Sequence, residues 1–230
     1  MIERKFVGEN IKEFQIQEYI SNTLKNVGHS HTKLQRTPLG EKIIIFTSRP
    51  GLVVGRKGEN IKKLTVTLKK KFNLENPTIE ISEVEQPHLN ASIVAERIAS
   101  TIERFGIQKF KAIGHKTMED VMNAGAMGIE IIMSGKIPSQ RAKSWRFYKG
   151  YLKKCGNIAL TGVKRAQAWA QMKSGTVGIK VAIMPPDVKL PDDIIVKDRD
   201  QPVPVEKKSE NVVGKSEDQT TAKSVADGAA

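Results

Sequence analysis

The chain is poor in cysteine and has no long hydrophobic run. Its single cysteine, Cys155, has no partner for an internal disulfide, which fits the reducing conditions of the cytoplasm. No segment approaches the roughly 20 apolar residues of a membrane-spanning helix. The charged residues at the N-terminus are not followed by the apolar segment of a secretory signal. We therefore expect a cytoplasmic protein that has no membrane partner.

Acidic residues are missing from residues 131–186, which carry eleven Lys or Arg residues. The whole chain has 38 Lys and Arg residues against 25 Asp and Glu residues, a net charge of +13. From residue 191 onward there are six basic and nine acidic residues, so the positive excess belongs to the part before it. A domain with such one-sided charge repels itself unless a polyanion neutralises it. The composition therefore predicts a nucleic-acid partner.

Metal-ligand clusters and catalytic groups are missing as well. His29 and His31 are two potential ligands, but no third or fourth ligand lies near them in the sequence, so we interpret this segment as a polar turn. The chain shows no Ser-His-Asp, Cys-His or carboxylate-metal pattern. We expect no metal, no cofactor and no enzymatic activity.

The most distinctive motif is the Gly-Arg-Lys-Gly segment at residues 55–58. Two glycines can take positive φ angles, and they lack the Cβ atom that would keep a ligand backbone at a distance. Two cations lie between them, and the helix that follows directs its N-terminal N–H groups towards the loop. The motif predicts a clamp for a polyanion such as a chain of phosphates. Its predicted RNA-binding residues are Gly55, Arg56, Lys57, Gly58, Lys62 and Lys63.

An isolated Gly-x-x-Gly sequence is more often an exposed turn than a binding loop. Here the loop is followed by apolar residues at helical spacing, which predict a helix packed behind it. Around this helix, the periodicity predicts a helix at 10–27 capped by Asn10, strands at 33–37 and 42–47, and a strand at 78–82. With a short helix before the loop, the order is αββααβ, an α+β arrangement.

A second helix-and-sheet domain is predicted after residue 106. We expect a helix capped by Asn90 and ended by Gly106 to close the first domain and to bridge to the second. A capping box at Thr117 predicts a short helix from there to about Asn123, and Gly114 should interrupt any helix before it. Four strands of a mainly antiparallel sheet are predicted at 128–137, 141–152, 163–172 and 176–184. The expected domains are residues 1–106, residues 107–190 and a flexible acidic and polar tail at 191–230.

Cations and aromatic residues alternate along the second of these strands. On one of its faces Trp145 and Phe147 lie between basic residues, a pattern suited to RNA phosphates and to stacking on bases. Alternatively, the two aromatic side chains belong to the core. The basic residues of the second domain predicted to bind RNA are Arg141, Lys143, Arg146, Lys149, Lys153, Lys154, Lys164 and Arg165.

Several segments resemble one known family. The sequence GLVVGRKGENIKKL, in an αββααβ order, is similar to the type II KH domain, an RNA-binding module. The sequences GAMGIEIIMSGKIPSQRAKSWRFYKGYL and GTVGIKVAIMPP follow it. Together they resemble the family of the third protein of the small ribosomal subunit, in its archaeal and eukaryotic form, over residues 1 to about 190.

This resemblance implies a structural component of the head of the small ribosomal subunit, with ribosomal RNA and neighbouring head proteins as partners. It also implies contact with mRNA where mRNA enters the subunit, through Lys111, His115 and Lys116. The family often has a second basic residue after Lys111, whereas this chain has Ala112. In the family these basic residues also help to open mRNA duplexes, and Ala112 and the expected helix break at Gly114 both predict weaker unwinding.

Two other functions are compatible with the sequence. One is an RNA chaperone or assembly factor that acts outside the ribosome. The other is a lyase that attacks damaged DNA through a lysine Schiff base, an activity attributed to some eukaryotic relatives. Such a lysine needs a lowered pKa, and no feature of the sequence singles out one lysine for this role.

Overall fold

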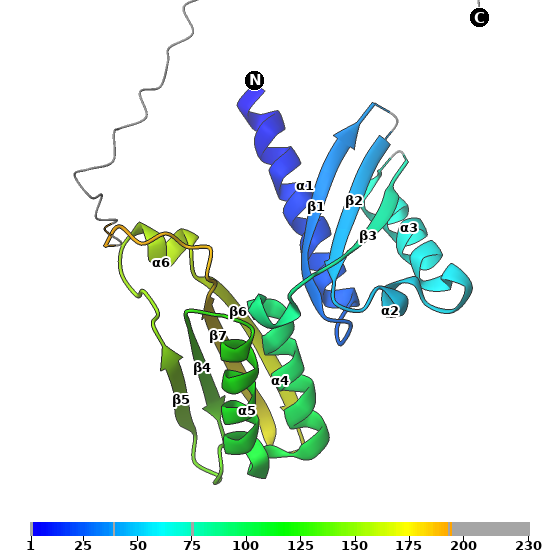
Figure 1. The fold of residues 1–230 in the computed structure, drawn as a ribbon. Coiled ribbons are helices and arrows are strands. Elements are labelled where there is room, and N and C mark those ends of the chain that lie inside the picture. Colours follow the sequence, from blue (N-terminus) through cyan, green and yellow to red (C-terminus); the bar gives the residue numbers. More distant parts are fainter. Residues whose placement is uncertain (1, 39, 75, 193, 195–230) are drawn as a thin grey trace, which may run out of the picture. The chain divides into compact units, whose positions relative to one another are not determined.

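The computed structural model describes residues 2–38, 40–74, 76–192 and 194, and most of the expected tail lies outside them. The fold is α+β, with two sheets that each have a separate core (Figure 1). The helices, with short 3₁₀ turns marked η, are α1 (Ile2–Thr23), α2 (Pro50–Val54), η1 (Arg56–Gly58), α3 (Glu59–Phe72), η2 (Pro87–Leu89), α4 (Ala91–Phe105), η3 (Ile107–Lys109), α5 (Phe110–Asn123) and α6 (Asn157–Thr161). The strands are β1 (His29–Thr37), β2 (Gly40–Thr47), β3 (Thr78–Glu83), β4 (Gly128–Gly135), β5 (Lys143–Gly150), β6 (Lys164–Met172) and β7 (Gly175–Met184). In this described part of the chain, no helix has both the length and the apolar character needed to cross a membrane.

The first domain has the predicted αββααβ order. Strand β2 is the centre of its sheet, antiparallel to β1 and parallel to β3. A single hydrophobic cluster joins this sheet to α1 and α3, because the apolar stripe of each helix faces it. The buried residues of the cluster are Ile16, Ile20, Leu24, Ile43, Ile45, Val53, Leu64, Leu68 and Leu74.

Helix α1 begins eight residues before the predicted cap. Asn10 lies inside the helix, so the expected start was wrong. No proline precedes Asn10, and Gly8 costs only about 1 kcal/mol in a helix interior, so nothing in this segment stops the helix. The added turns leave Ile2 and Phe6 exposed.

The second domain is a four-stranded antiparallel sheet in the order β5-β4-β7-β6, and its antiparallel pairing agrees with the prediction. Helices α4 and α5 cover one face of it (Figure 1). Apolar residues that alternate along β4 and β7 fill the space beneath the helices. These buried residues are Ile129, Ile131, Met133, Val177, Ile179, Val181 and Ile183. The strand alternation therefore assigns one face to the core.

Helix α4 has the expected ends but a different packing partner. Asn90 caps it by accepting a hydrogen bond from the backbone N–H of Ser92 (3.1 Å), and it ends before Gly106 at φ 82°. Its buried residues, Val94, Ile98 and Ile102 among them, belong to the core of the second sheet and not to that of the first. The helix that we expected to close the first domain and to bridge to the second thus packs mainly on β6 and β7 of the second. The boundary at residue 106 stays a prediction.

Helix α5 is twice as long as expected. Thr117 does not start it, and Gly114 does not interrupt it. Thr117 is not a cap: it is buried within the helix, and its hydroxyl donates to the carbonyl of Ile113 (2.7 Å). A Cβ atom at Gly114 would lie 3.1 Å from three carbon atoms of the Phe147 ring. Gly114 therefore lets α5 approach β5 closely.

We expect Gly114→Val to lower the free energy of unfolding by about 1–3 kcal/mol, because the added methyl groups would overlap Phe147. The matched control is Ala112→Val, since Ala112 is exposed on the same helix; its cost should stay below about 1 kcal/mol, the range of helix propensity. Urea denaturation measures both. Equal costs would show that the packing of α5 on β5 does not limit the residue at 114.

Candidate nucleic-acid interface

The Gly-x-x-Gly loop has the backbone that its glycines predict. Gly55, Lys57 and Gly58 have φ angles of 70°, 54° and 74°, in the region that favours glycine. Lys57 is the non-glycine residue among them, and such backbone strain is common at ligand-binding loops. The side chains of Arg56 and Lys57 are exposed. The loop thus presents two cations on a backbone that a ligand can approach.

Asn60 braces the loop, which the sequence analysis missed. Its Nδ2 atom donates to the carbonyl of Leu52 (3.4 Å). Gly55 has a φ of 70°, which favours glycine, and an added Cβ atom would also displace the Asn60 amide, whose Nδ2 atom would lie 2.5 Å away. A polar residue in the first turn after the loop is the signal that could have indicated this role.

The two helix lysines next to the loop differ in their surroundings. Lys63 pairs with Glu59 at 2.6 Å, one turn earlier on α3. The hydrogen bond from Lys63 lowers the pKa of Glu59, and the positive charge of Lys63 adds to this effect. Lys62 is exposed and, among the described residues, has no ion pair. Lys62 is therefore better placed than Lys63 to extend the positive charge of the loop.

Of the three aromatic residues of β5, Trp145 and Phe147 pack on the core side. Phe147 is only 8% exposed. The Trp145 ring lies against Phe110 of α5 (centroids 5.3 Å apart), and its Nε1 atom donates to the carbonyl of Ile137 (3.2 Å). The interpretation that these rings stack on RNA bases is thus wrong, and the alternative is confirmed. The sequence pattern was ambiguous because basic residues flank the aromatic pair at both ends of the strand.

The opposite face of the second sheet carries exposed polar side chains. Strand register places two rows across it. One row runs Arg146, Ile132, Lys180 and Gln167, and the other runs Tyr148, Glu130, Ala182 and Arg165. We call these eight residues the open face. Their exposed members are Arg146, Tyr148, Arg165, Gln167 and Lys180.

Glu130 organises the cations at one side of the open face. Its side chain is 12% exposed, pairs with Arg146, and accepts a hydrogen bond from Lys154 (3.1 Å). Burial opposes the charge of this carboxylate, but the hydrogen bonds from Arg146 and Lys154 outweigh burial and lower the pKa of Glu130. The guanidinium of Arg146 also lies over the Tyr148 ring, 5.1 Å from its centroid.

The structure thus separates the predicted basic residues of the second domain into groups. Arg146, Lys154 and Arg165 lie on or beside the open face. Lys143 and Lys149 share the side of β5 that carries Trp145 and Phe147, but both are exposed. The remaining predicted residues, found beyond the ends of β5 or at the start of β6, are Arg141, Lys153 and Lys164.

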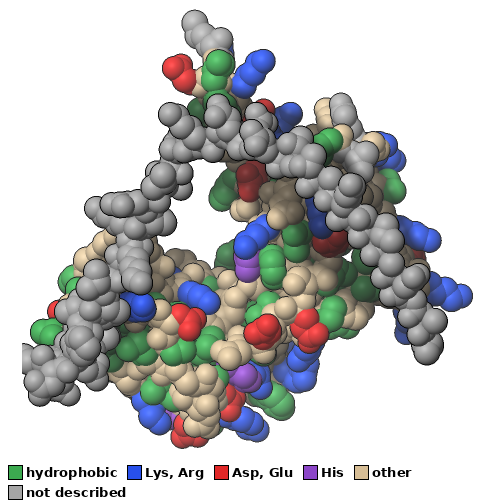
Figure 2. Space-filling model, turned by 45° about the horizontal axis from the view of Figure 1, so that its top comes forward, with side chains coloured by type: hydrophobic (Ala, Val, Ile, Leu, Met, Phe, Trp, Pro, Cys, Tyr) green, Lys and Arg blue, Asp and Glu red, His purple; other side chains and the backbone are tan. Residues whose placement is uncertain are grey.

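The sequence analysis missed Lys180, Tyr148 and Glu130 on the open face. Lys180 follows from the alternation of β7, which puts it opposite the buried Ile179 and Val181. Glu130 lies one residue before the acid-free stretch, so the sequence analysis, which considered only residues 131–186, left it out. In the view of Figure 2, basic side chains are spread over the surface with acidic ones among them, and no single patch holds them all.

Helix α5 holds the three residues that the sequence analysis assigned to mRNA contact. Lys111 Nζ lies 5.2 Å from the centroid of the Trp145 ring. The His115 ring lies edge-on to Phe147, with centroids 5.4 Å apart. Lys116 occupies the next position of the same helix. Trp145 and Phe147 of β5 therefore contact two of the three side chains, Lys111 and His115 respectively.

His29 and His31 form no metal site with other side chains of the described residues. His29 Nε2 lies 2.9 Å from the hydroxyl of Thr32. Burial, together with the charge of His31, lowers the pKa of His29 from 6.5 to about 4. The His31 ring stacks on Phe46, with centroids 4.3 Å apart. His29 is therefore a neutral, partly buried side chain near pH 7.

Comparison with known proteins gives matches to both domains in series. The KH domain family matches residues 15–89, and the family of the C-terminal domain of ribosomal protein S3 matches residues 98–183. The chain is 46% identical over 198 residues to the small ribosomal subunit protein uS3 of Methanocaldococcus jannaschii, covering 86% of this chain and 94% of that protein. The corresponding proteins of Methanococcus maripaludis and Methanococcus aeolicus are 45% identical over 196 residues and 41% identical over 198 residues, with 85% and 86% of this chain and 92% and 94% of theirs covered.

Replacing Arg56 and Lys57 by Asp should weaken RNA binding by about 1 kcal/mol for each phosphate interaction that the change removes, and the effect should shrink as salt rises. The matched control replaces Lys69 and Lys70 by Asp, which makes the same change in net charge at the far end of α3. Filter binding over a salt series measures both variants. If the control weakens binding as much, the net charge and not the loop explains the effect.

Between pH 6.5 and about 4, the unfolded chain binds a proton at His29 that the folded chain does not. Acidification through this range should therefore destabilise the fold, by up to roughly 3 kcal/mol from this side chain. His29→Gln should make the free energy of unfolding less steep in pH there. Urea denaturation at several pH values tests this, and an unchanged slope would contradict the assignment to His29.

Proposed function

Because the chain belongs to the uS3 family of small ribosomal subunit proteins, we propose that it is a structural component of the small subunit that binds ribosomal RNA. The observation that carries this proposal is the open face, where exposed cations and a tyrosine lie on a sheet whose other face is buried. Basic side chains at this density suit phosphate contacts, which position a protein without reading sequence. The place of action is the ribosome in the cytoplasm.

The Gly-x-x-Gly loop supplies a second RNA contact in this proposal. Its positive φ angles and its exposed Arg56 and Lys57 support the approach of a phosphate backbone. Lys62 extends this surface along α3. Two separate basic surfaces on one chain raise the effective concentration of RNA at the second surface once the first is bound. The two contacts together favour a large, folded RNA as the partner.

We also propose that α5 contacts mRNA where it enters the subunit. Support comes from Lys111, His115 and Lys116, which lie on one continuous helix because Gly114 does not break it. The helix break that we expected to weaken the action of α5 on mRNA is therefore absent. The missing basic residue at Ala112 is still expected to weaken it. A photoreactive group at Lys116, in subunits loaded with mRNA, tests this role. Crosslinks that form only with ribosomal RNA would contradict it.

The catalytic alternative has no observation in its favour, and the relatives are named as ribosomal proteins. Borohydride trapping with abasic DNA distinguishes it from the structural role. A covalent adduct would overturn the proposal that this protein is not an enzyme.

The first test of the proposed function is sedimentation of tagged protein from a cell lysate through a sucrose gradient after a wash in high salt. We expect one copy per small subunit. Lys180→Glu should weaken binding to isolated ribosomal RNA roughly fivefold, because it reverses a charge at the centre of the open face.

Lys173→Glu is the matched control, since Lys173 is an exposed residue of the same acid-free stretch and lies in the turn between β6 and β7. A free or substoichiometric protein in the gradient would instead favour an RNA chaperone or assembly factor. Equal decreases of affinity in the two variants would exclude the open face as the specific contact.

A further inference from the structure

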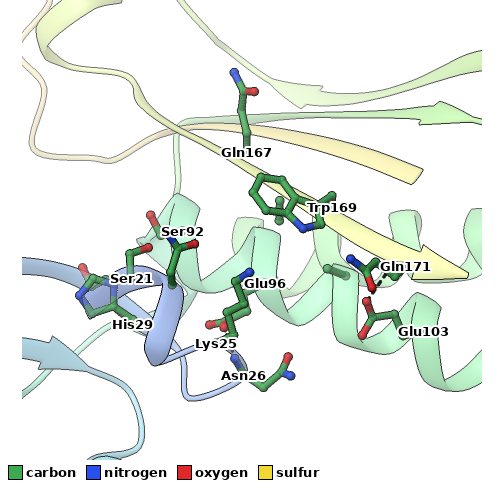
Figure 3. Close-up of a pocket in the computed structure, with 14 residues that line it drawn as sticks. Ser21, Lys25, Asn26, His29, Ser92, Glu96, Glu103, Gln167, Trp169 and Gln171 are labelled. Atoms are coloured by element: carbon green, nitrogen blue, oxygen red, sulfur yellow. Dashed lines mark hydrogen bonds between the residues drawn. The ribbon is translucent and has the colours of Figure 1, made fainter. Parts of the chain in front are cut away.

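A pocket of about 410 Å³ lies between the end of α1, the start of β1, and the edge formed by α4 and β6. Its size falls in the range of roughly 300–1,000 Å³ that is usual for binding sites. Figure 3 shows Trp169 on β6, Glu103 beside Gln171, and Glu96 beside Lys25 and Asn26. Neither the Gly-x-x-Gly loop nor the open-face cations Arg146 and Lys180 line it. Of the open-face residues, Gln167 alone lines it, so the pocket adjoins the edge of the open face and does not include the Gly-x-x-Gly loop.

Two carboxylates give this pocket a local charge opposite to that of the chain. Glu103 accepts a hydrogen bond from the backbone N–H of Gln171 (2.8 Å). Glu96 accepts one from the backbone N–H of Gly28 (3.0 Å) and another from that of Asn26. An ionised carboxylate has about four acceptor positions, so both groups retain capacity for a further donor. A phosphate would meet two negative charges and one lysine here.

Trp169 supplies a flat aromatic surface. Its side chain is 56% exposed although it lines a pocket. Lys25 Nζ lies 5.3 Å from the centroid of its ring, so a cation already occupies this surface within the chain. An aromatic ring that attracts a cation, with carboxylates nearby, is the combination that binds a guanidinium group, which stacks on the ring and donates to the carboxylates.

We propose that this pocket binds an arginine side chain of a neighbouring protein in the small subunit. The proposal rests on the proposed function, because it assumes protein neighbours on the ribosome. Arginine fits better than a nucleotide, since the charge of the pocket repels phosphate and attracts a guanidinium. Lys25 competes for the same ring and leaves it when the arginine binds.

The test places photoreactive benzoylphenylalanine at Ser21, an exposed residue that lines the pocket, in assembled and salt-washed subunits. We expect a crosslink to a protein segment that contains an arginine, identified by mass spectrometry. Glu103→Gln and Trp169→Ala should each reduce the yield of this adduct about threefold, because they remove a charge and a cation–π partner respectively. Lys25→Ala should raise the yield, because it removes the competing cation.

The positional control is the same probe at Gln15, an exposed residue of α1 that does not line the pocket. It should not give this adduct. Crosslinks from Ser21 to RNA alone, no crosslink, or a yield unaffected by Glu103→Gln and Trp169→Ala would each overturn the proposal. A chain that does not sediment with the subunit contradicts the proposed function instead, so the two failures are distinguishable.

Discussion

The burial of one face of the second sheet under α4 and α5 is the constraint on which the basic surface depends. Side chains alternate between the two faces of a strand, so burying Ile129, Ile131 and Ile179 forces Glu130, Ile132 and Lys180 to the other face. Arg146, Arg165 and Lys180 of the acid-free stretch therefore share the open face, while Lys143 and Lys149 are exposed at the ends of β5 on its other side. A one-residue shift in register would bury lysine and expose isoleucine, which keeps the arrangement fixed.

The sequence showed that apolar and polar residues alternate along the strands. It did not show, for every strand, which of the two faces is buried. In β7 a continuous apolar series identified the core side. In β5 the apolar series has only two members, Trp145 and Phe147, between charged residues at both ends, and the pattern alone did not say which face a helix would cover. The position of α5 decided it. That position depends on Gly114, whose role is to make space for Phe147 and not to end the helix. A glycine in a helical segment can mark either the end of the helix or a close approach to a neighbouring element. Only the side chain packed against it, here Phe147, distinguishes the two.

The Gly-x-x-Gly loop was the more predictable of the two surfaces because its cause is local. Positive φ angles at Gly55 and Gly58 follow from residue type within four positions of the chain. The brace from Asn60 is also local, although no rule of sequence singles it out. By contrast, the packing of α4 on the second sheet depends on residues about 70 positions later in the chain. The same apolar stripe would suit either core, and the sequence alone did not show that it would pack mainly on the second.

The few acidic residues near the basic surfaces have definite structural tasks. Glu130 holds Arg146 and Lys154, Glu59 holds Lys63, and Glu96 binds the backbone of the turn between α1 and β1. Each carboxylate is paired with a basic side chain or with backbone N–H groups, which offsets the free energy lost when its hydration is reduced. Glu96 also connects the first domain to the helix that packs on the second sheet. A firm connection reduces the entropic cost of binding one RNA with both basic surfaces. The acidic residues therefore support RNA binding by fixing positions, while the cations supply the attraction.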